Sequence, residues 1–143
     1  MPTWLKVTVI LIALFAALLG TAIYVGYRSM QQISGDSKKT LAEASAYGRG
    51  KDVTVCLDQA LARATTQCAK GDAFCVVDAQ WFLVGCVNSS TVPPAYCAAI
   101  PQRKSFSFDK RWAEEECARR GHANDSRCTQ ILVTLQGYCT SRR

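Results

Sequence analysis

The sequence predicts an all-α protein with a single N-terminal transmembrane helix and a disulfide-stapled bundle of about four helices, arranged as two helical hairpins. Three observations support this prediction. Residues 7–27 are uncharged, four later segments carry apolar residues at helical spacing, and eight cysteines lie near the ends of those segments. We expect a signal-anchor helix over 1–33, a polar linker over 34–51 and a helical domain over 52–143.

The uncharged run, VTVILIALFAALLGTAIYVGY, is long enough to cross a bilayer. At about 1.5 Å per residue it extends roughly 31 Å, which matches the thickness of the hydrocarbon core. Trp4 and Tyr27 lie near its two ends, where aromatic side chains favour the membrane interface. A cleavable signal peptide with a site at Gly20-Thr21-Ala22 is the alternative. Because the apolar run continues beyond Ala22, we favour a retained anchor.

Small residues share one face of this helix. Their positions follow the i, i+3, i+4, i+7 pattern: Ala13, Ala16, Ala17 and Gly20. Helices in lipid associate where small side chains let their backbones approach closely. We therefore expect this face to pack against another transmembrane helix, although such residues are also common in membrane helices in general.

The distribution of charge and the cysteine content predict opposite membrane topologies. Five basic residues follow the span within the first 51 residues, and only Lys6 precedes it. This distribution would place the C-terminal part in the cytoplasm. Eight cysteines in a small domain instead indicate an oxidising compartment. We give the redox argument more weight and expect an inner (plasma) membrane protein with its C-terminal domain in the periplasm. The mitochondrial inner membrane, facing the intermembrane space, is the alternative.

The first hairpin is predicted from residues 52–89. Asp52 is a favourable N-cap for a helix over 52–70, in which apolar residues recur at helical spacing. Gly71 ends that helix and Asp72 caps the next, over 73–89. The second helix is apolar on nearly every side, so we expect it either to be central in the bundle or to offer a face to a partner.

The second hairpin follows a connector rich in proline. We expect only a short helix around 95–100, because Pro93, Pro94 and Pro101 interrupt the segment. Asp109 then caps a helix over 110–120, which Gly121 ends. A last helix is predicted over 126–140.

Helix geometry ranks the possible disulfides. Cys68 and Cys75 flank the first turn, while Cys56 and Cys86 lie twelve and eleven residues from these two, so both pairs reach across the hairpin at the same level. The same reasoning pairs Cys117 with Cys128 across the second turn. This leaves Cys97 and Cys139, which would join the connector to the end of the chain. Sequence alone leaves the other pairings open.

The first hairpin resembles the coiled-coil-helix-coiled-coil-helix proteins of the mitochondrial intermembrane space, in which paired cysteines staple two antiparallel helices. The resemblance covers residues 56–86 only. Those proteins have nine residues between the cysteines of each arm, whereas this chain has eleven between Cys56 and Cys68 and ten between Cys75 and Cys86. We interpret the likeness as the same physical solution reached separately.

No catalytic, cofactor or metal motif is evident. The closest cysteines are Cys68 and Cys75, too far apart for the tight pairs that metal and iron–sulfur sites use. His122 follows a glycine cap and reads as a surface-turn histidine, and the run Glu114–Glu116 reads as a solvated helix face. We expect no enzyme activity, no cofactor and no metal.

The expected function is structural. We expect an accessory subunit of a larger membrane protein complex, for example an energy-converting one, that braces neighbouring subunits from the extracytoplasmic side. Its expected partners are other membrane subunits and membrane lipids. A net charge of +6, spread over both ends of the chain, does not favour nucleic acid. The alternative is a membrane-tethered module that binds a lipid or small apolar ligand between Trp81, Phe82 and Trp112.

Overall fold

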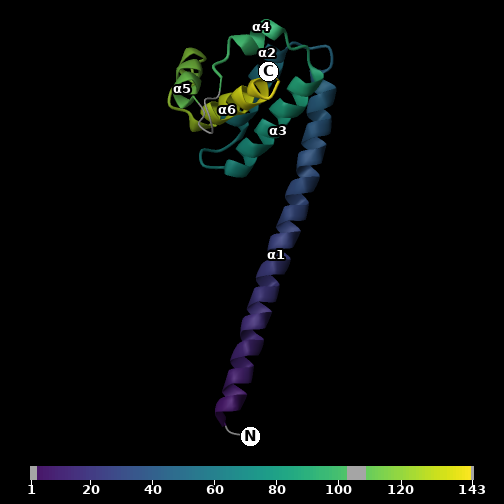
Figure 1. Cartoon of the computed structure of the whole chain (residues 1–143), viewed down its shortest axis with the longest axis vertical. Helices are drawn as coiled ribbons and strands as arrows, with labels where there is room; N and C mark the ends of the chain where they lie inside the picture. The colour runs from purple at the N-terminus through teal and green to yellow at the C-terminus, as the bar shows by residue number, and fades with distance from the viewer. Residues whose placement is uncertain (1–2, 103–108, 143) are drawn as a thin grey trace. The chain divides into compact units, whose positions relative to one another are not determined.

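The computed structural model describes the backbone of residues 3–102 and 109–142, and the side chains of 12–26, 37–102 and 109–142. All regular structure in these ranges is helical, which confirms the predicted class. The helices, in chain order, are α1 (Thr3–Gly48), α2 (Val53–Ala62), the π-helix η1 (Arg63–Gln67), α3 (Ala73–Ser89), α4 (Pro94–Ala98), α5 (Lys110–Arg119) and α6 (Ser126–Thr140) (Figure 1). The chain divides into two compact units, residues 1–36 and 37–143.

The first unit consists of the N-terminal part of α1. Every side chain described here, over 12–26, is exposed, including large apolar ones such as Phe15, Leu18 and Ile23. Over the residues that the structure describes, no helix meets the combined length and apolarity required to cross a membrane. Within the run over 7–27, the side chains of 7–11 and 27 lie outside the described residues. The membrane-spanning role of this run therefore stays a prediction.

The second unit begins with the last part of α1, residues 37–48, where we expected a polar linker. This segment is helical up to Gly48 and packs against α3. Its inward positions, Thr40, Ala44 and Gly48, recur every four residues and are all small and buried. Apolar periodicity did not reveal this face, because it lacks the large side chains that make a helical pattern visible.

Aspartate caps set the helix boundaries in the second unit. Asp52, Asp72 and Asp109 each accept a hydrogen bond from a backbone N–H in the first turn of α2, α3 and α5. These caps confirm the predicted helix starts, and Asp125 serves α6 in the same way. The first predicted helix, over 52–70, is α2 followed by the five-residue π-helix η1, and it ends at Gln67, three residues before the predicted end.

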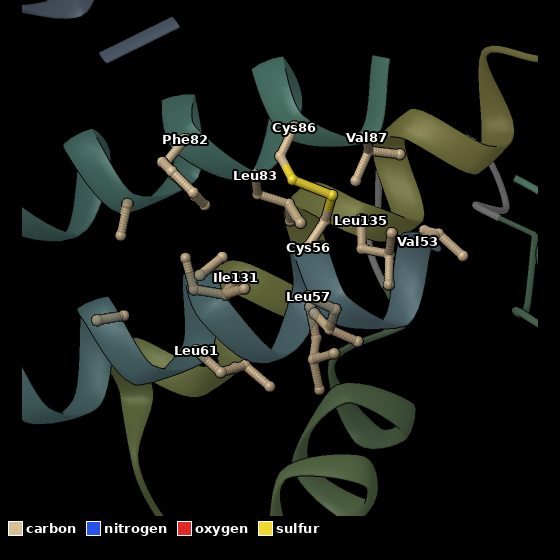
Figure 2. Close-up of a cluster of buried hydrophobic side chains, with 14 of the residues drawn as sticks. Val53, Cys56, Leu57, Leu61, Phe82, Leu83, Cys86, Val87, Ile131 and Leu135 are labelled. Carbon is tan, nitrogen blue, oxygen red and sulfur yellow. A yellow bond between two sulfur atoms is a disulfide. The ribbon is translucent and has the colours of Figure 1, made fainter. Parts of the chain in front are cut away.

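The core of the second unit lies where α3 meets α2 and α6. Figure 2 shows Phe82, Leu83 and Val87 of α3 pointing toward Leu57 of α2 and Ile131 of α6, among other apolar side chains. All five are at most 1% exposed. Since α3 also contacts residues 37–48 of α1, it is the central helix, as its apolar composition predicted.

A short backbone contact closes the base of the first hairpin. The Thr91 N–H donates to the Lys51 carbonyl at 2.9 Å, and the Val53 N–H donates to the Thr91 carbonyl at 3.2 Å. The two ends of the hairpin are therefore hydrogen-bonded to each other just before α2 and just after α3. This contact complements the cysteine staples higher in the hairpin.

Candidate functional site

All eight cysteines are paired in disulfides. The pairs are Cys56–Cys86, Cys68–Cys75, Cys97–Cys139 and Cys117–Cys128, the same four that helix geometry favours. Their Cα–Cα distances run from 5.1 to 6.0 Å, within the range that a disulfide spans without moving the backbone. The sulfur atoms therefore form a structural framework and leave no thiolate for catalysis.

The bridges join the helices of the second unit from α2 onward. Cys56–Cys86 joins α2 to α3, and Cys68–Cys75 closes the turn before α3 (the first is drawn in Figure 2). Cys97–Cys139 joins α4 to α6, and Cys117–Cys128 joins α5 to α6. Each helix from α2 to α6 is therefore cross-linked directly or through the adjoining turn.

The segment 37–48 of α1 has no disulfide and is held by other contacts. Thr40 Oγ1 donates to Asp78 Oδ1 at 2.5 Å, and Ser45 Oγ donates to the Gly85 carbonyl at 3.4 Å. At Gly85 an added Cβ would lie 2.9 Å from the Cβ of Ala44, so the two helices touch at backbone distance. Sequence reasoning missed this crossing, although an isolated glycine within the apolar helix α3 was a signal for it.

Arg63 connects three elements at the start of η1. Its guanidinium group forms an ion pair with Glu43 of α1 and lies 3.8 Å above the ring centroid of Phe82 in α3. The Arg63 Nε atom is buried without a hydrogen-bond partner among the described atoms. A planar cation stacked on an aromatic ring is stabilised by the quadrupole of the ring. Arg63 therefore covers Phe82 and closes the junction of α1, α2 and α3.

A second arginine joins α5 to α2. Arg120 donates to Glu116 Oε1 at 2.8 Å and to Asp58 Oδ1 of α2 at 2.7 Å. Burial by itself lowers the pKa of Arg120, but the carboxylates of Glu116 and Asp58 have the larger combined effect, so the pKa of Arg120 is raised. Nearby, burial raises the pKa of the half-buried Tyr96 to about 12; Arg120 counteracts this increase, while Asp58 adds to it. The cluster is an ion-pair contact between the two hairpins.

The turn between α5 and α6 is fixed by hydrogen bonds. The His122 N–H donates to the Cys117 carbonyl at 2.8 Å, which places this histidine in the turn, as expected. Arg127 forms an ion pair with Asp125 at 2.7 Å and donates to the Cys68 carbonyl at 2.5 Å. Hydrogen bonds from Arg127 lower the pKa of Asp125. Arg127 thereby links the turn of the second hairpin to that of the first.

Two of the three consecutive glutamates form ordinary helix ion pairs. Glu114 pairs with Lys110 at 3.2 Å, and Glu116 pairs with both Arg119 and Arg120. Consecutive residues of α5 point in different directions, so the three carboxylates do not converge on a common point.

Gln136 is a fully buried polar residue that sequence reasoning missed. Its Nε2 donates to the Pro101 carbonyl at 2.9 Å, and its Oε1 accepts from the Asp109 N–H at 3.2 Å. One amide on α6 therefore holds both flanks of the connector before α5. No sequence signal reveals this role, because a glutamine on a helix is usually exposed.

The three aromatic residues expected to line a ligand cavity differ in burial. Phe82 is buried beneath Arg63, while Trp81 is 41% exposed and Trp112 packs at the edge of the core. Two adjoining hollows of about 370 and 450 Å³ lie elsewhere, between α5 and α6. The residues that line both hollows are Lys110, Thr129 and Gln130. The first is largely apolar and also touches Gln80 of α3 and Val133.

Most of the exposed large apolar residues that the structure describes form two groups, with Val55 of α2 apart from both. Phe74, Val77 and Trp81 follow one another at i, i+3 and i+7 on α3 and are 75%, 39% and 41% exposed. The second group is on α1, where the predicted small-residue face of Ala13, Ala16, Ala17 and Gly20 is exposed. A Cβ added at Gly20 would meet nothing within 4 Å. Both groups are available for contact with other molecules.

The chain matches no protein-family model, no curated protein sequence and no solved structure. Within the described parts of the chain, no three His, Cys, Asp or Glu side chains come close enough to hold a metal ion. The described residues form a cross-linked helical framework with exposed apolar surfaces.

Proposed function

We propose that this protein is a structural accessory subunit of a larger membrane protein complex, anchored by residues 7–27 and bracing its neighbours from the extracytoplasmic side with residues 37–143. The observation that supports this proposal above all is the disulfide framework. Four bridges cross-link every helix from α2 to α6, so the domain is suited to hold a fixed shape and present fixed surfaces.

The same bridges support an extracytoplasmic location. Structural disulfides persist in oxidising compartments such as the periplasm and are rare in the cytosol. The proposed site is therefore the periplasmic face of an inner membrane, with the mitochondrial intermembrane space as the alternative. We give the disulfides more weight than the basic residues Arg28, Lys38 and Lys39, whose positions would by themselves favour the opposite topology.

Two further features support the anchor and its partner. The side chains over 12–26 are apolar and exposed, and they need a non-aqueous environment or a protein surface to cover them. Ala13, Ala16, Ala17 and Gly20 share one side of this helix and would allow a second helix to approach closely. The proposed partner at this face is a transmembrane helix of another subunit.

Mild-detergent extraction of the tagged full-length chain tests the proposal. An accessory subunit co-purifies with other membrane proteins at fixed stoichiometry. The variant Ala17→Leu, which places a bulky side chain on the small-residue face, is expected to reduce the yield of those partners. The matched control is Ala22→Leu, which makes the same change on the opposite side of the helix and is expected to leave the partners bound.

Elution of the wild-type chain without any partner protein would contradict the proposal. Recovery alone but with bound lipid would favour the alternative, a membrane-tethered module for a lipid or small apolar ligand. The observation that favours this second function is the largely apolar hollow of about 370 Å³ beside α3 and α6. Mass spectrometry of the extracted material distinguishes the two outcomes.

A further inference from the structure

We propose that the exposed strip Phe74–Val77–Trp81 on α3 inserts into the interfacial zone of a phospholipid bilayer and holds the disulfide-linked domain against the membrane. This inference rests on the anchor in the proposed function and adds the surface by which the domain meets the lipid. The strip is the most exposed group of large apolar side chains described in the second unit.

The neighbours of the strip fix its orientation on α3. Asp78, one position after Val77, faces α1 and accepts a hydrogen bond from Thr40. Gln80, one position before Trp81, faces α6 and donates to the Gln130 carbonyl at 3.3 Å. The strip is therefore a narrow ridge on α3 with α1 on one side and α6 on the other. Its side chains have no place in the core and point outward.

The strip lies close to the first residues of the second unit. Thr40, which contacts Asp78 next to the strip, is only three residues after Ser37, where the second unit starts. Ser37 is ten positions after Tyr27, and even a fully extended chain would span only about 35 Å over this stretch. An anchored chain therefore keeps the strip close to the lipid surface without help from any partner.

The composition of the strip and its surroundings suits phospholipid. Tryptophan and phenylalanine favour the interfacial zone, and lysines beside them attract phosphate groups. Exposed lysines lie on three sides: Lys38 and Lys39 on α1, Lys70 before α3 and Lys110 at the hollow next to Gln80. Three carboxylates lie near these lysines: Asp72 caps α3, Asp78 accepts from Thr40 and Glu114 pairs with Lys110. The hollow offers additional apolar wall beside the strip.

The size of the strip favours lipid over protein as its occupant. A stable protein interface usually buries about 800 Å² on each partner. Three side chains on one ridge cover much less, so they would be a small part of such an interface. Partial insertion of a few aromatic side chains, in contrast, is enough to hold a domain that is already tethered.

The test uses the full-length chain in vesicles of phosphatidylglycerol and phosphatidylcholine. Trp4→Phe and Trp112→Phe leave Trp81 as the only tryptophan of the three in the chain. Vesicles with brominated acyl chains are expected to quench Trp81 emission and shift it to the blue. Phe74→Gln and Val77→Gln are each expected to lower the ratio of docked to undocked domain, by roughly tenfold for the phenylalanine.

A matched control separates docking from general loss of apolar surface. Val55 on α2 is 39% exposed, as is Val77, but it lies outside the strip. Val55→Gln is therefore expected to leave Trp81 quenching unchanged. Circular dichroism and the absence of free thiols verify that each variant keeps its fold, so that a lost signal reports docking.

The possible results separate this inference from the proposed function. If the protein floats with the vesicles but Trp81 stays unquenched, docking is wrong and the anchor stands. If quenching persists in both Phe74→Gln and Val77→Gln, the strip is not the docking surface. If Trp81 is shielded from solvent only when a co-purified protein is retained, the strip binds protein, and the proposal that lipid covers it is wrong. A chain that does not float overturns the anchor and the docking together.

Discussion

Gly48 lies directly against the backbone of Cys86: a Cβ added at Gly48 would come within 2.3 Å of the Cys86 carbonyl oxygen. Such a distance is far shorter than any non-bonded carbon–oxygen contact. The end of α1 and the end of α3 can therefore meet only because residue 48 has no side chain. Cys86 is in turn bridged to Cys56, so this contact links α1 to the most buried part of the framework.

The first prediction is that Gly48→Ala destabilises the second unit. The methyl group must push α1 away from α3 and disturb the neighbouring contacts, at a cost of about 1–3 kcal/mol in the free energy of unfolding. Denaturant unfolding of the full-length chain, followed by circular dichroism, measures the change. The matched control is Gly137→Ala in α6, where an added Cβ meets nothing within 4 Å. There we expect about 0.5–1 kcal/mol of stabilisation, because alanine favours the helix.

A second prediction concerns the buried amide of Gln136. Gln136→Leu removes the partners of the Pro101 carbonyl and the Asp109 N–H and leaves both groups unpaired. We expect a loss of about 2–4 kcal/mol in the free energy of unfolding. Faster hydrogen exchange of the Asp109 amide is the local sign. Gln130→Leu, on an exposed position of the same helix, provides the control. Equal stability of the two variants would contradict the proposed role of the amide.

The parts of this fold that were predictable from sequence are those that local chemistry determines. Asp52, Asp72 and Asp109 mark helix starts because each carboxylate accepts a nearby backbone N–H. The cysteine pairs follow from helical rise, since Cys56 and Cys86 lie at matching distances from one turn. In these cases the deciding contacts involve residues whose spacing along the chain can be counted.

The parts that sequence did not reveal depend on contacts between distant segments. The docking of residues 37–48 depends on a fit of Gly48 and Ala44 against α3, and small residues give no amphipathic signal. The π-helical turn η1 places Arg63 over Phe82, and helical periodicity alone does not distinguish it from an α-helix. The burial of Phe82, which we expected to line a ligand cavity, has a related cause. Phe82 is buried under a cation that lies nineteen positions earlier in the chain.

A third prediction is a loss of stability at high pH caused by Tyr96. Its pKa rises from 10.0 to about 12 in the fold, mainly through burial. The folded state therefore holds this proton more tightly than the unfolded state does. The resulting stabilisation is complete below pH 10 and disappears as the pH rises toward 12. We expect it to contribute about 1–2 kcal/mol, because the side chain retains some access to solvent.

The measurement is denaturant unfolding at pH values on both sides of this window. Tyr96→Phe is expected to flatten the pH dependence between 10 and 12 and to remove one late step from the tyrosinate absorbance titration. Tyr24 is exposed in the first unit, so Tyr24→Phe serves as the control and should leave the late step in place. If the late step of the absorbance titration persists in Tyr96→Phe, that step belongs to another group.

The final prediction ranks two of the disulfides by stability and by ease of reduction. Cys68–Cys75 spans seven positions, whereas Cys97–Cys139 spans forty-two. Loop-closure entropy assigns the two bridges about 2.5 and about 4 kcal/mol respectively, so replacing both cysteines of the longer bridge with serine should lower the free energy of unfolding more.

Reduction of the two bridges should follow a different order. Cys75 is the one cysteine that is half-buried while the other seven are buried, so a mild reductant reaches its bridge first. Differential alkylation followed by peptide mass spectrometry detects that order. Early opening of Cys97–Cys139 instead would show that α4 separates from α6 more readily than its contacts indicate.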